Sequence, residues 1–178
     1  GDYAIRLLPG YAQLDKWDTF NGSTDGLNMY WEPYTSDTLQ VDTLNQQLII
    51  NVTTDNMLGY AVPDGENLIW SDLYIQADIQ IEGAPSYAEY GFLVREDVEA
   101  DTFYSFTYSS DGDYTLYYFD SAEWQVVQEW TVSPVVDGLA KQARIGLWVQ
   151  GYTFRAYFNG RLAGEITDLT QYAAEGTI

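Results

Sequence analysis

The sequence contains no cysteine and no histidine. Without cysteine the chain has no disulfide and no thiol chemistry. Without histidine it lacks the side chain that most often ligates transition metals or acts as a general base near neutral pH. Basic residues are also scarce, because 7 Lys and Arg stand against 27 Asp and Glu, for a formal net charge of −20. We therefore expect binding to neither nucleic acid nor an anionic membrane surface, since both require a basic patch.

The few basic residues are unevenly placed. Between Trp17 and Ala140 the only one is Arg95, set against 22 acidic residues. The simplest interpretation is a soluble, self-repelling surface. The alternatives are cation binding, or pairing of the acidic body with the more basic ends of the chain.

The sequence shows neither a signal peptide nor an apolar run long enough for a membrane-spanning helix. It begins at Gly1 and not at Met, so we expect a processed product. Asn21 and Asn51 each begin an Asn-x-Ser/Thr glycosylation sequon, which is a weak three-residue pattern.

Aromatic residues are abundant, with 16 Tyr and 6 Trp, and most of the chain alternates apolar and polar residues with a period of two. This pattern indicates β-strands. Asp111-Gly112 and Asn159-Gly160 are typical hairpin turns between such strands. About eleven short strands and no amphipathic helix predict an all-β antiparallel sandwich or jelly roll. The expected strands and other segments are 38–42, 46–53, 57–62, 73–81, a meander over 87–130, 143–149, 152–158 and 161–166, a loop over 17–36, and one short helical turn over 168–175.

Several of these segments carry a familiar pattern. The segments are EYGFLVR at 89–95, TFYSF at 102–106, SDGDY at 110–114, Glu123-Trp124, WTVSP at 130–134 and FRAYFNG at 154–160. Together they resemble the concanavalin A-like, laminin-G-like jelly-roll modules of bacterial secreted and cell-surface proteins. The resemblance covers residues 17–178 and implies one sandwich domain, preceded by an arm at 1–16, and an extracellular or cell-surface location.

Relatives with this fold include lectins, carbohydrate-binding modules, glycoside hydrolases and adhesive modules, so the resemblance does not fix the activity. The laminarinase-type hydrolases carry a Glu-x-Asp-x-Glu motif along a strand, and this sequence lacks it. The nearest acidic stretch, 96–101, falls in a predicted loop. We expect the chain not to be an enzyme.

Two kinds of binding residue are predicted. Acidic loops offer the carboxylate oxygens that calcium prefers, although solvated turns would have the same composition. Aromatic side chains on one face of a sheet could stack on sugar rings or on another subunit, although one of the two alternating sets must form the core. The candidate calcium ligands are Glu96, Asp97, Glu99, Asp101, Asp111 and Asp113. The candidate stacking residues are Tyr104, Tyr108, Tyr117, Trp148 and Tyr157, with Phe106 and Phe119 beside them.

The two ends of the chain suggest self-association. The resemblance implies a further strand beyond Gly176, and a sandwich lacking a strand exposes an unpaired edge. The arm alternates like a strand and could fill such an edge in a neighbouring copy, giving filaments, or fold back into its own domain. Its pairing residues would be Tyr3, Ile5, Leu7 and Leu8. We thus expect an extracellular structural or adhesive homopolymer, or alternatively a carbohydrate-binding module assisted by calcium.

Overall fold

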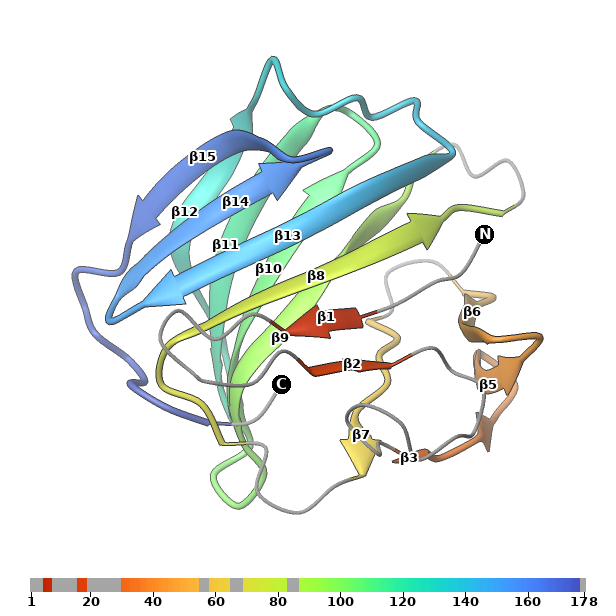
Figure 1. The fold of residues 1–178 in the computed structure, drawn as a ribbon. Coiled ribbons are helices and arrows are strands. Elements are labelled where there is room, and N and C mark those ends of the chain that lie inside the picture. Colours follow the sequence, from red (N-terminus) through yellow and green to blue (C-terminus); the bar gives the residue numbers. More distant parts are fainter. Residues whose placement is uncertain are drawn as a thin grey trace.

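The computed structural model describes residues 5–7, 16–18, 30–54, 58–64, 69–82 and 87–176. Across these ranges it contains fifteen β-strands and no helix. Figure 1 shows two large sheets packed face to face, with the longest strands of one sheet crossing in front of the other. The prediction of an all-β antiparallel sandwich is therefore confirmed. No helix in the described part of the chain is long and apolar enough to cross a membrane.

The front sheet has six strands in the order β15-β14-β13-β8-β1-β2, and every neighbouring pair is antiparallel. Hairpins join β13, β14 and β15, whereas β8 pairs with β13 across more than sixty residues. The strands are β1 (Ile5–Leu7), β2 (Lys16–Asp18), β8 (Leu73–Gln80), β13 (Gln142–Gln150), β14 (Thr153–Phe158) and β15 (Arg161–Thr167).

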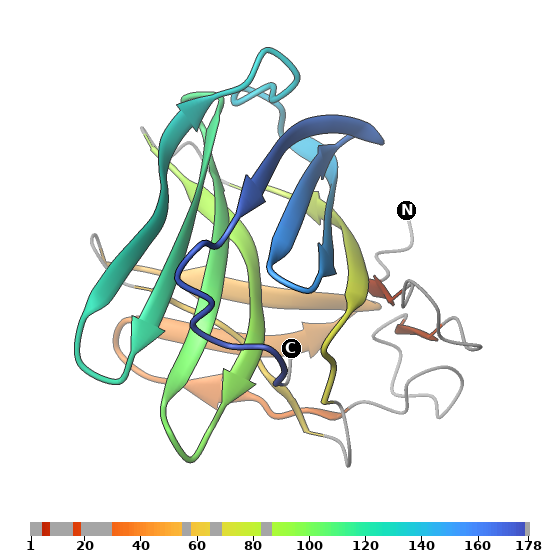
Figure 2. The same ribbon diagram turned by 90° about the vertical axis from the view of Figure 1, so that its left-hand side faces the viewer.

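The rear sheet is the predicted meander, with four antiparallel strands in the order β12-β11-β10-β9. Figure 2 shows this sheet on one side of the molecule and β13, β14 and β15 on the other. Each strand pairs with the next one in the chain, so local turns are sufficient to build this sheet. The strands are β9 (Glu89–Asp97), β10 (Thr102–Ser109), β11 (Asp113–Asp120) and β12 (Trp124–Val132).

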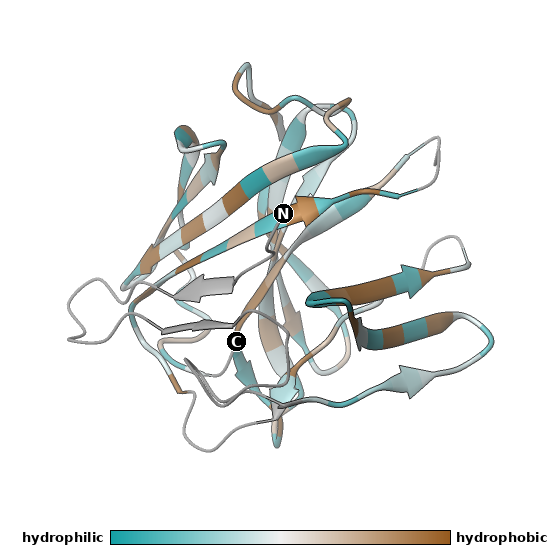
Figure 3. Cartoon of the chain, turned by 45° about the vertical axis from the view of Figure 1, so that its right-hand side comes forward, coloured by the Kyte–Doolittle hydropathy of each residue, from teal (hydrophilic) through white to brown (hydrophobic). Residues whose placement is uncertain are grey.

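The core lies between the two sheets and follows from the period-two pattern. The alternation is visible as bands of colour along the long strands in Figure 3. Burying one large apolar side chain of this kind contributes about 1.5–3 kcal/mol before ordering costs. The inward side chains include the predicted set Ala143, Ile145, Leu147 and Val149, together with Leu73, Ile75, Tyr104, Phe106, Tyr108, Phe154 and Phe158.

Two small sheets complete the described part. The predicted strand over 57–62 is wrong for residues 58–62, which form no strand. At Gly59 an added Cβ would lie 2.5 Å from Val52 and 2.7 Å from Leu39, so this segment packs closely against side chains instead of extending the ladder. The strands are β3 (Tyr30–Trp31) with β7 (Pro63–Asp64), and β4 (Tyr34–Thr35) with β5 (Leu39–Leu44) and β6 (Gln47–Val52). Four of these residues, 30–31 and 34–35, lie in the predicted loop over 17–36.

Both predicted hairpin turns are confirmed. Asn159 and Gly160 have φ values of 50° and 77°, the pair of positive angles that a type I′ turn requires. Gly112, with a φ of 86°, turns β10 into β11. Asn159 also accepts a hydrogen bond from the Arg144 N–H on its side-chain oxygen, at 2.8 Å, so this turn is attached to β13.

The N-terminal arm pairs within its own chain. In β1, Ile5 lies opposite Ala77 and Leu7 opposite Ile75, so β1 extends the six-stranded sheet beyond β8. This pairing is the folded-back alternative, and donation of the arm to a neighbouring copy stays a prediction. An own-chain strand reaches this edge without the entropy cost of association. The other two predicted pairing residues, Tyr3 and Leu8, lie outside the described residues.

The expected helical turn over 168–175 is wrong. This segment is irregular, with bends at 169–170 and 174, and Asp168 accepts hydrogen bonds from the N–H groups of Thr170 and Tyr172, at 2.8 and 3.0 Å. Gly176 then pairs with Trp70 in an isolated antiparallel bridge. The C-terminal segment is thus attached to the end of the sandwich by polar contacts, without helical hydrogen bonding.

Candidate functional site

The outward side chains of β8, β13 and β14 form a continuous polar and aromatic surface, hereafter the front face. They alternate with the buried set, so the same period of two that builds the core directs them outward. The residues of the front face are Tyr74, Gln76, Asp78, Arg144, Gly146, Trp148, Arg155 and Tyr157.

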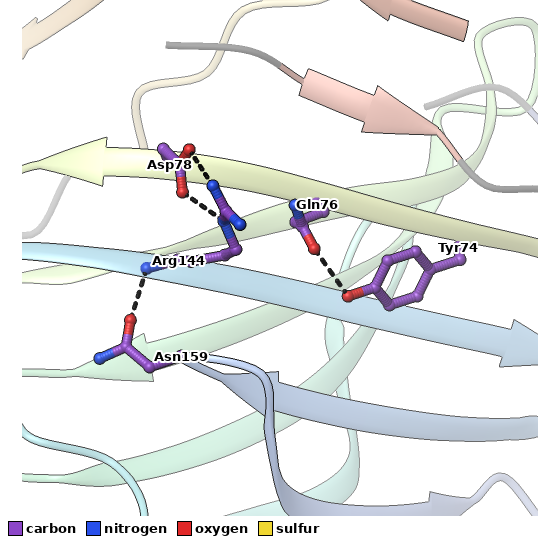
Figure 4. Close-up of polar contacts among 5 residues, drawn as sticks. All are labelled: Tyr74, Gln76, Asp78, Arg144 and Asn159. Atoms are coloured by element: carbon purple, nitrogen blue, oxygen red, sulfur yellow. Dashed lines mark hydrogen bonds and ion pairs between the residues drawn. The ribbon is translucent and has the colours of Figure 1, made fainter. Parts of the chain in front are cut away.

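An arginine–carboxylate pair joins the two central strands of this face. Arg144 donates from Nε to Asp78 Oδ1 at 2.6 Å and from Nη2 to Asp78 Oδ2 at 2.7 Å (Figure 4). This bidentate geometry fixes both side chains. The hydrogen bonds that Arg144 donates to Asp78 raise the pKa of Arg144 above its ordinary value. Both side chains stay accessible, with 53% of Arg144 and 33% of Asp78 exposed.

A tyrosine ring lies against the sheet beside this pair. A Cβ added to Gly146 would lie 2.6 Å from the Tyr74 oxygen and 3.1 Å from its Cζ, so the ring occupies the space that any larger residue would fill. Tyr74 donates to Gln76 Oε1 at 3.1 Å (Figure 4), and the Tyr157 ring meets it edge-on, with centroids 6.0 Å apart and planes at 77°. Burial raises the pKa of Tyr74. Three contacts thus hold the Tyr74 ring in one orientation.

Trp148 also lies on the front face, but the side chain of Arg155 covers one side of its ring. The guanidinium of Arg155 sits 4.4 Å from the centre of its ring, in cation–π contact. Arg155 is in turn paired with Glu165 at 2.6 Å. One face of the Trp148 ring is therefore occupied within the protein.

This combination of groups suits a polyhydroxylated ligand. A flat aromatic ring offers a surface for the C–H face of a sugar ring, while nearby Arg, Asp and amide groups supply donors and acceptors for hydroxyl groups.

A second aromatic cluster lies on the outer face of the four-stranded sheet. Trp124 is 46% exposed, and its ring centre lies 5.0 Å from Phe119, 5.6 Å from Phe103 and 6.1 Å from Tyr117. No polar pair comparable to Arg144 and Asp78 accompanies these rings among the contacts of the described residues. This rear cluster is the competing location for a stacking site.

The predicted stacking residues are divided among three places. Tyr104 and Tyr108 have no exposed surface, so the expectation that they stack on a ligand is wrong: their side of β10 faces the other sheet. Phe106 is buried with them. Tyr117 and Phe119 belong to the rear cluster, whereas Trp148 and Tyr157 lie on the front face.

Six residues of the front face were not predicted from the sequence: Tyr74, Gln76, Asp78, Arg144, Gly146 and Arg155. The available signal was the alternation itself. Once the apolar residues of 73–81 and 143–149 are assigned to the core, the residues between them must point outward. What the alternation could not reveal is that these two strands are neighbours.

The six candidate calcium ligands do not form one cluster. Glu96, Asp97, Glu99 and Asp101 lie at the β9–β10 turn, and Asp111 and Asp113 at the β10–β11 turn, at opposite ends of β10. Asp97 accepts the N–H groups of Glu99 and Ala100, and Asp113 accepts the Ser109 hydroxyl. Within the described ranges no three acidic side chains gather closely enough to hold a metal ion. Calcium binding stays a prediction, and any such site would need water or main-chain ligands.

Of the two sequons, the one at Asn51 lies on β6 with its asparagine exposed, and the one at Asn21 lies outside the described residues. Glycosylation of either stays a prediction.

Comparison with known proteins gives one informative result. Neither a protein-family model nor a curated protein sequence matches the chain. Among solved structures, the chain is similar to the carbohydrate binding module CBM66 from Bacillus subtilis, with a TM-score of 0.52 and 16% identity over 84% of this chain and 81% of that one. At this identity the likeness concerns the fold alone. It agrees with the jelly-roll sandwich, while the narrower concanavalin A-like assignment stays a proposal.

Proposed function

We propose that this chain is a carbohydrate-binding module and that its front face binds the polysaccharide. The observation that carries the proposal is the Tyr74 ring, held flat over Gly146 beside the exposed Arg144–Asp78 pair. A fixed ring and a fixed polar pair reduce the ordering cost of binding, because neither has to be immobilised by the ligand.

The fold likeness supports this function, since the similar Bacillus subtilis structure is itself a carbohydrate binding module. The own-chain pairing of β1 lends no support to the alternative, a homopolymer built by strand donation. We propose further that the module acts outside the cell and binds its ligand without cleaving it. Incubation with the bound polysaccharide should release no reducing sugar.

The test is affinity electrophoresis of the full chain in gels containing glucan, xylan, mannan or galactan. We expect retardation by at least one polymer. Tyr74→Ala should weaken it about tenfold or more, which corresponds to about 1.4 kcal/mol. Trp124→Ala is the matched control, because it removes an exposed aromatic ring from the rear cluster.

If Tyr74→Ala binds the polymer as tightly as the unmodified chain and Trp124→Ala loses affinity, the binding site lies at the rear cluster and not on the front face. Absence of retardation by all four polymers and by their charged counterparts would contradict the function itself.

A further inference from the structure

We propose that the ligand of the front face is a neutral polysaccharide, and that two adjacent hydroxyl groups of one sugar bind the Arg144–Asp78 pair. This inference rests on the proposed function and names the class of polymer and the group that is recognised. It is carried by the pairing of charges on this face and by the unused hydrogen-bonding capacity of the pair.

Both arginines that β13 and β14 contribute to the front face already have a carboxylate partner. Arg144 is paired with Asp78, and Arg155 with Glu165, all at 2.6–2.7 Å. A carboxylate or sulfate on a sugar would therefore meet arginines whose positive charge is already balanced by a neighbouring carboxylate. It would also approach a chain whose formal net charge is −20. Electrostatics thus disfavours an anionic polymer at this face.

A hydroxyl group faces no such obstacle, because it both donates and accepts. A guanidinium has five N–H groups, and two of those on Arg144 are used by Asp78. A carboxylate has about four acceptor positions, of which Arg144 fills two. The pair can therefore donate to one hydroxyl from Arg144 and accept from a second hydroxyl on Asp78 without breaking its own bonds.

The spacing favours neighbouring hydroxyls over distant ones. The donor and acceptor atoms of the pair are held 2.6–2.7 Å apart. Two hydroxyls on adjacent ring carbons lie within hydrogen-bonding distance of each other, so they can meet both groups at once. Tyr74 and Gln76 lie next to the pair on β8, where a ring bound through its hydroxyls could contact the Tyr74 ring.

The experiment uses the best-retarded neutral polymer in two forms, untreated and with its vicinal diols cleaved by periodate and reduced by borohydride. Polygalacturonate serves as the anionic polymer. We expect periodate treatment to weaken binding about tenfold or more, and polygalacturonate to bind at least tenfold more weakly than the untreated polymer, most of all at low salt.

The variant Asp78→Asn should lower affinity for the untreated polymer about tenfold. Asp137→Asn is its matched control, because it makes the same substitution in the loop after β12, away from the front face. Its affinity should stay within about twofold. Melting curves of both variants, expected to agree within a few degrees, exclude a folding defect.

The outcomes separate the two proposals. If the affinity for a neutral polymer is unchanged both after periodate treatment and in Asp78→Asn, the recognition of adjacent hydroxyls is overturned and the proposed function is left standing. If polygalacturonate binds more tightly than the untreated neutral polymer and salt weakens that binding, only the claim that the ligand is a neutral polysaccharide is overturned. Failure of every polymer, neutral and anionic, overturns the function and the inference together.

Discussion

The Tyr104 hydroxyl donates a 2.5 Å hydrogen bond to Asp168 Oδ2, joining residues 64 positions apart. Tyr104 has no exposed surface, and Asp168 is 2% exposed. The Tyr104 oxygen also accepts the Ala173 N–H at 3.1 Å. This buried bond attaches the C-terminal segment to β10.

Replacing Tyr104 by Phe should lower the free energy of unfolding by about 1–3 kcal/mol, because a buried carboxylate loses a donor and a buried N–H loses its acceptor. Urea denaturation measures the change. Tyr117→Phe is the control on the next strand, where the side chain is partly exposed, and its effect should stay within about 0.5 kcal/mol. Equal losses in the two variants would show that the bond with Asp168 does not stabilise the fold.

Arg95 is fully buried and donates to the carbonyls of Ser71, Gly151 and Ala173. Its burial lowers the pKa of the guanidinium. Arg95→Met should cost about 3 kcal/mol or more, because the fully buried side chain loses its hydrogen bonds to three carbonyls. Lysine should not restore stability, since it lacks the planar fork. The exposed control Arg155→Met should leave the free energy of unfolding nearly unchanged. An unchanged free energy of unfolding in Arg95→Met would contradict this stabilising role.

Stability should fall at alkaline pH. Burial raises the pKa of both Tyr104 and Tyr108 above the ordinary tyrosine value, which is about 10. Above that pH the unfolded chain loses phenol protons that the folded chain keeps, so the free energy of unfolding decreases as pH rises. Melting temperatures between about pH 8 and about pH 11 test this, with Tyr108→Phe expected to flatten the decrease. A melting temperature independent of pH in this range would contradict the buried placement.

Gly146→Ala should separate binding from stability. The added Cβ meets the outer end of the Tyr74 side chain and not backbone, so the ring can move aside. We expect a stability change below about 1 kcal/mol but a clear loss of polysaccharide affinity. Gln142→Ala, on the same face of the same strand, should leave both the stability and the polysaccharide affinity unchanged. Unchanged affinity in Gly146→Ala would mean that the position of Tyr74 does not matter.

Calcium binding at the β9–β10 turn has its own test. Bound calcium would raise the melting temperature, and a chelator would lower it. Asp97→Asn should remove the calcium response, with Asp113→Asn as the comparison at the other turn. An unchanged melting curve across millimolar calcium in the unmodified chain would leave these residues as turn formers only.

Local patterns predicted most strands of the two large sheets and both hairpin turns, because each depends on residues close together in the sequence. The direction of the side chains in β10 was harder. Both alternating sets contain aromatic residues, Phe103 on one side and Tyr104 on the other, so hydropathy cannot tell which set is buried. Only the position of the opposite sheet decides it.

The front face could not be predicted because it depends on long-range pairing. Asp78 and Arg144 are 66 positions apart, and they meet only because β8 lies beside β13. The same holds for the arm, since alternation identifies a strand without identifying its partner. The predicted strand over 57–62 failed for a related reason, because close side-chain packing at Gly59 replaced strand pairing.

The most direct test of the central claim is an NMR titration of the labelled chain with an oligosaccharide cut from the polymer that it binds. We predict that the largest amide shifts fall on β8, β13 and β14, around Tyr74, Arg144 and Tyr157, with little change around Trp124. Shifts centred on β11 and β12 around Trp124, with the front face unchanged, would contradict the account.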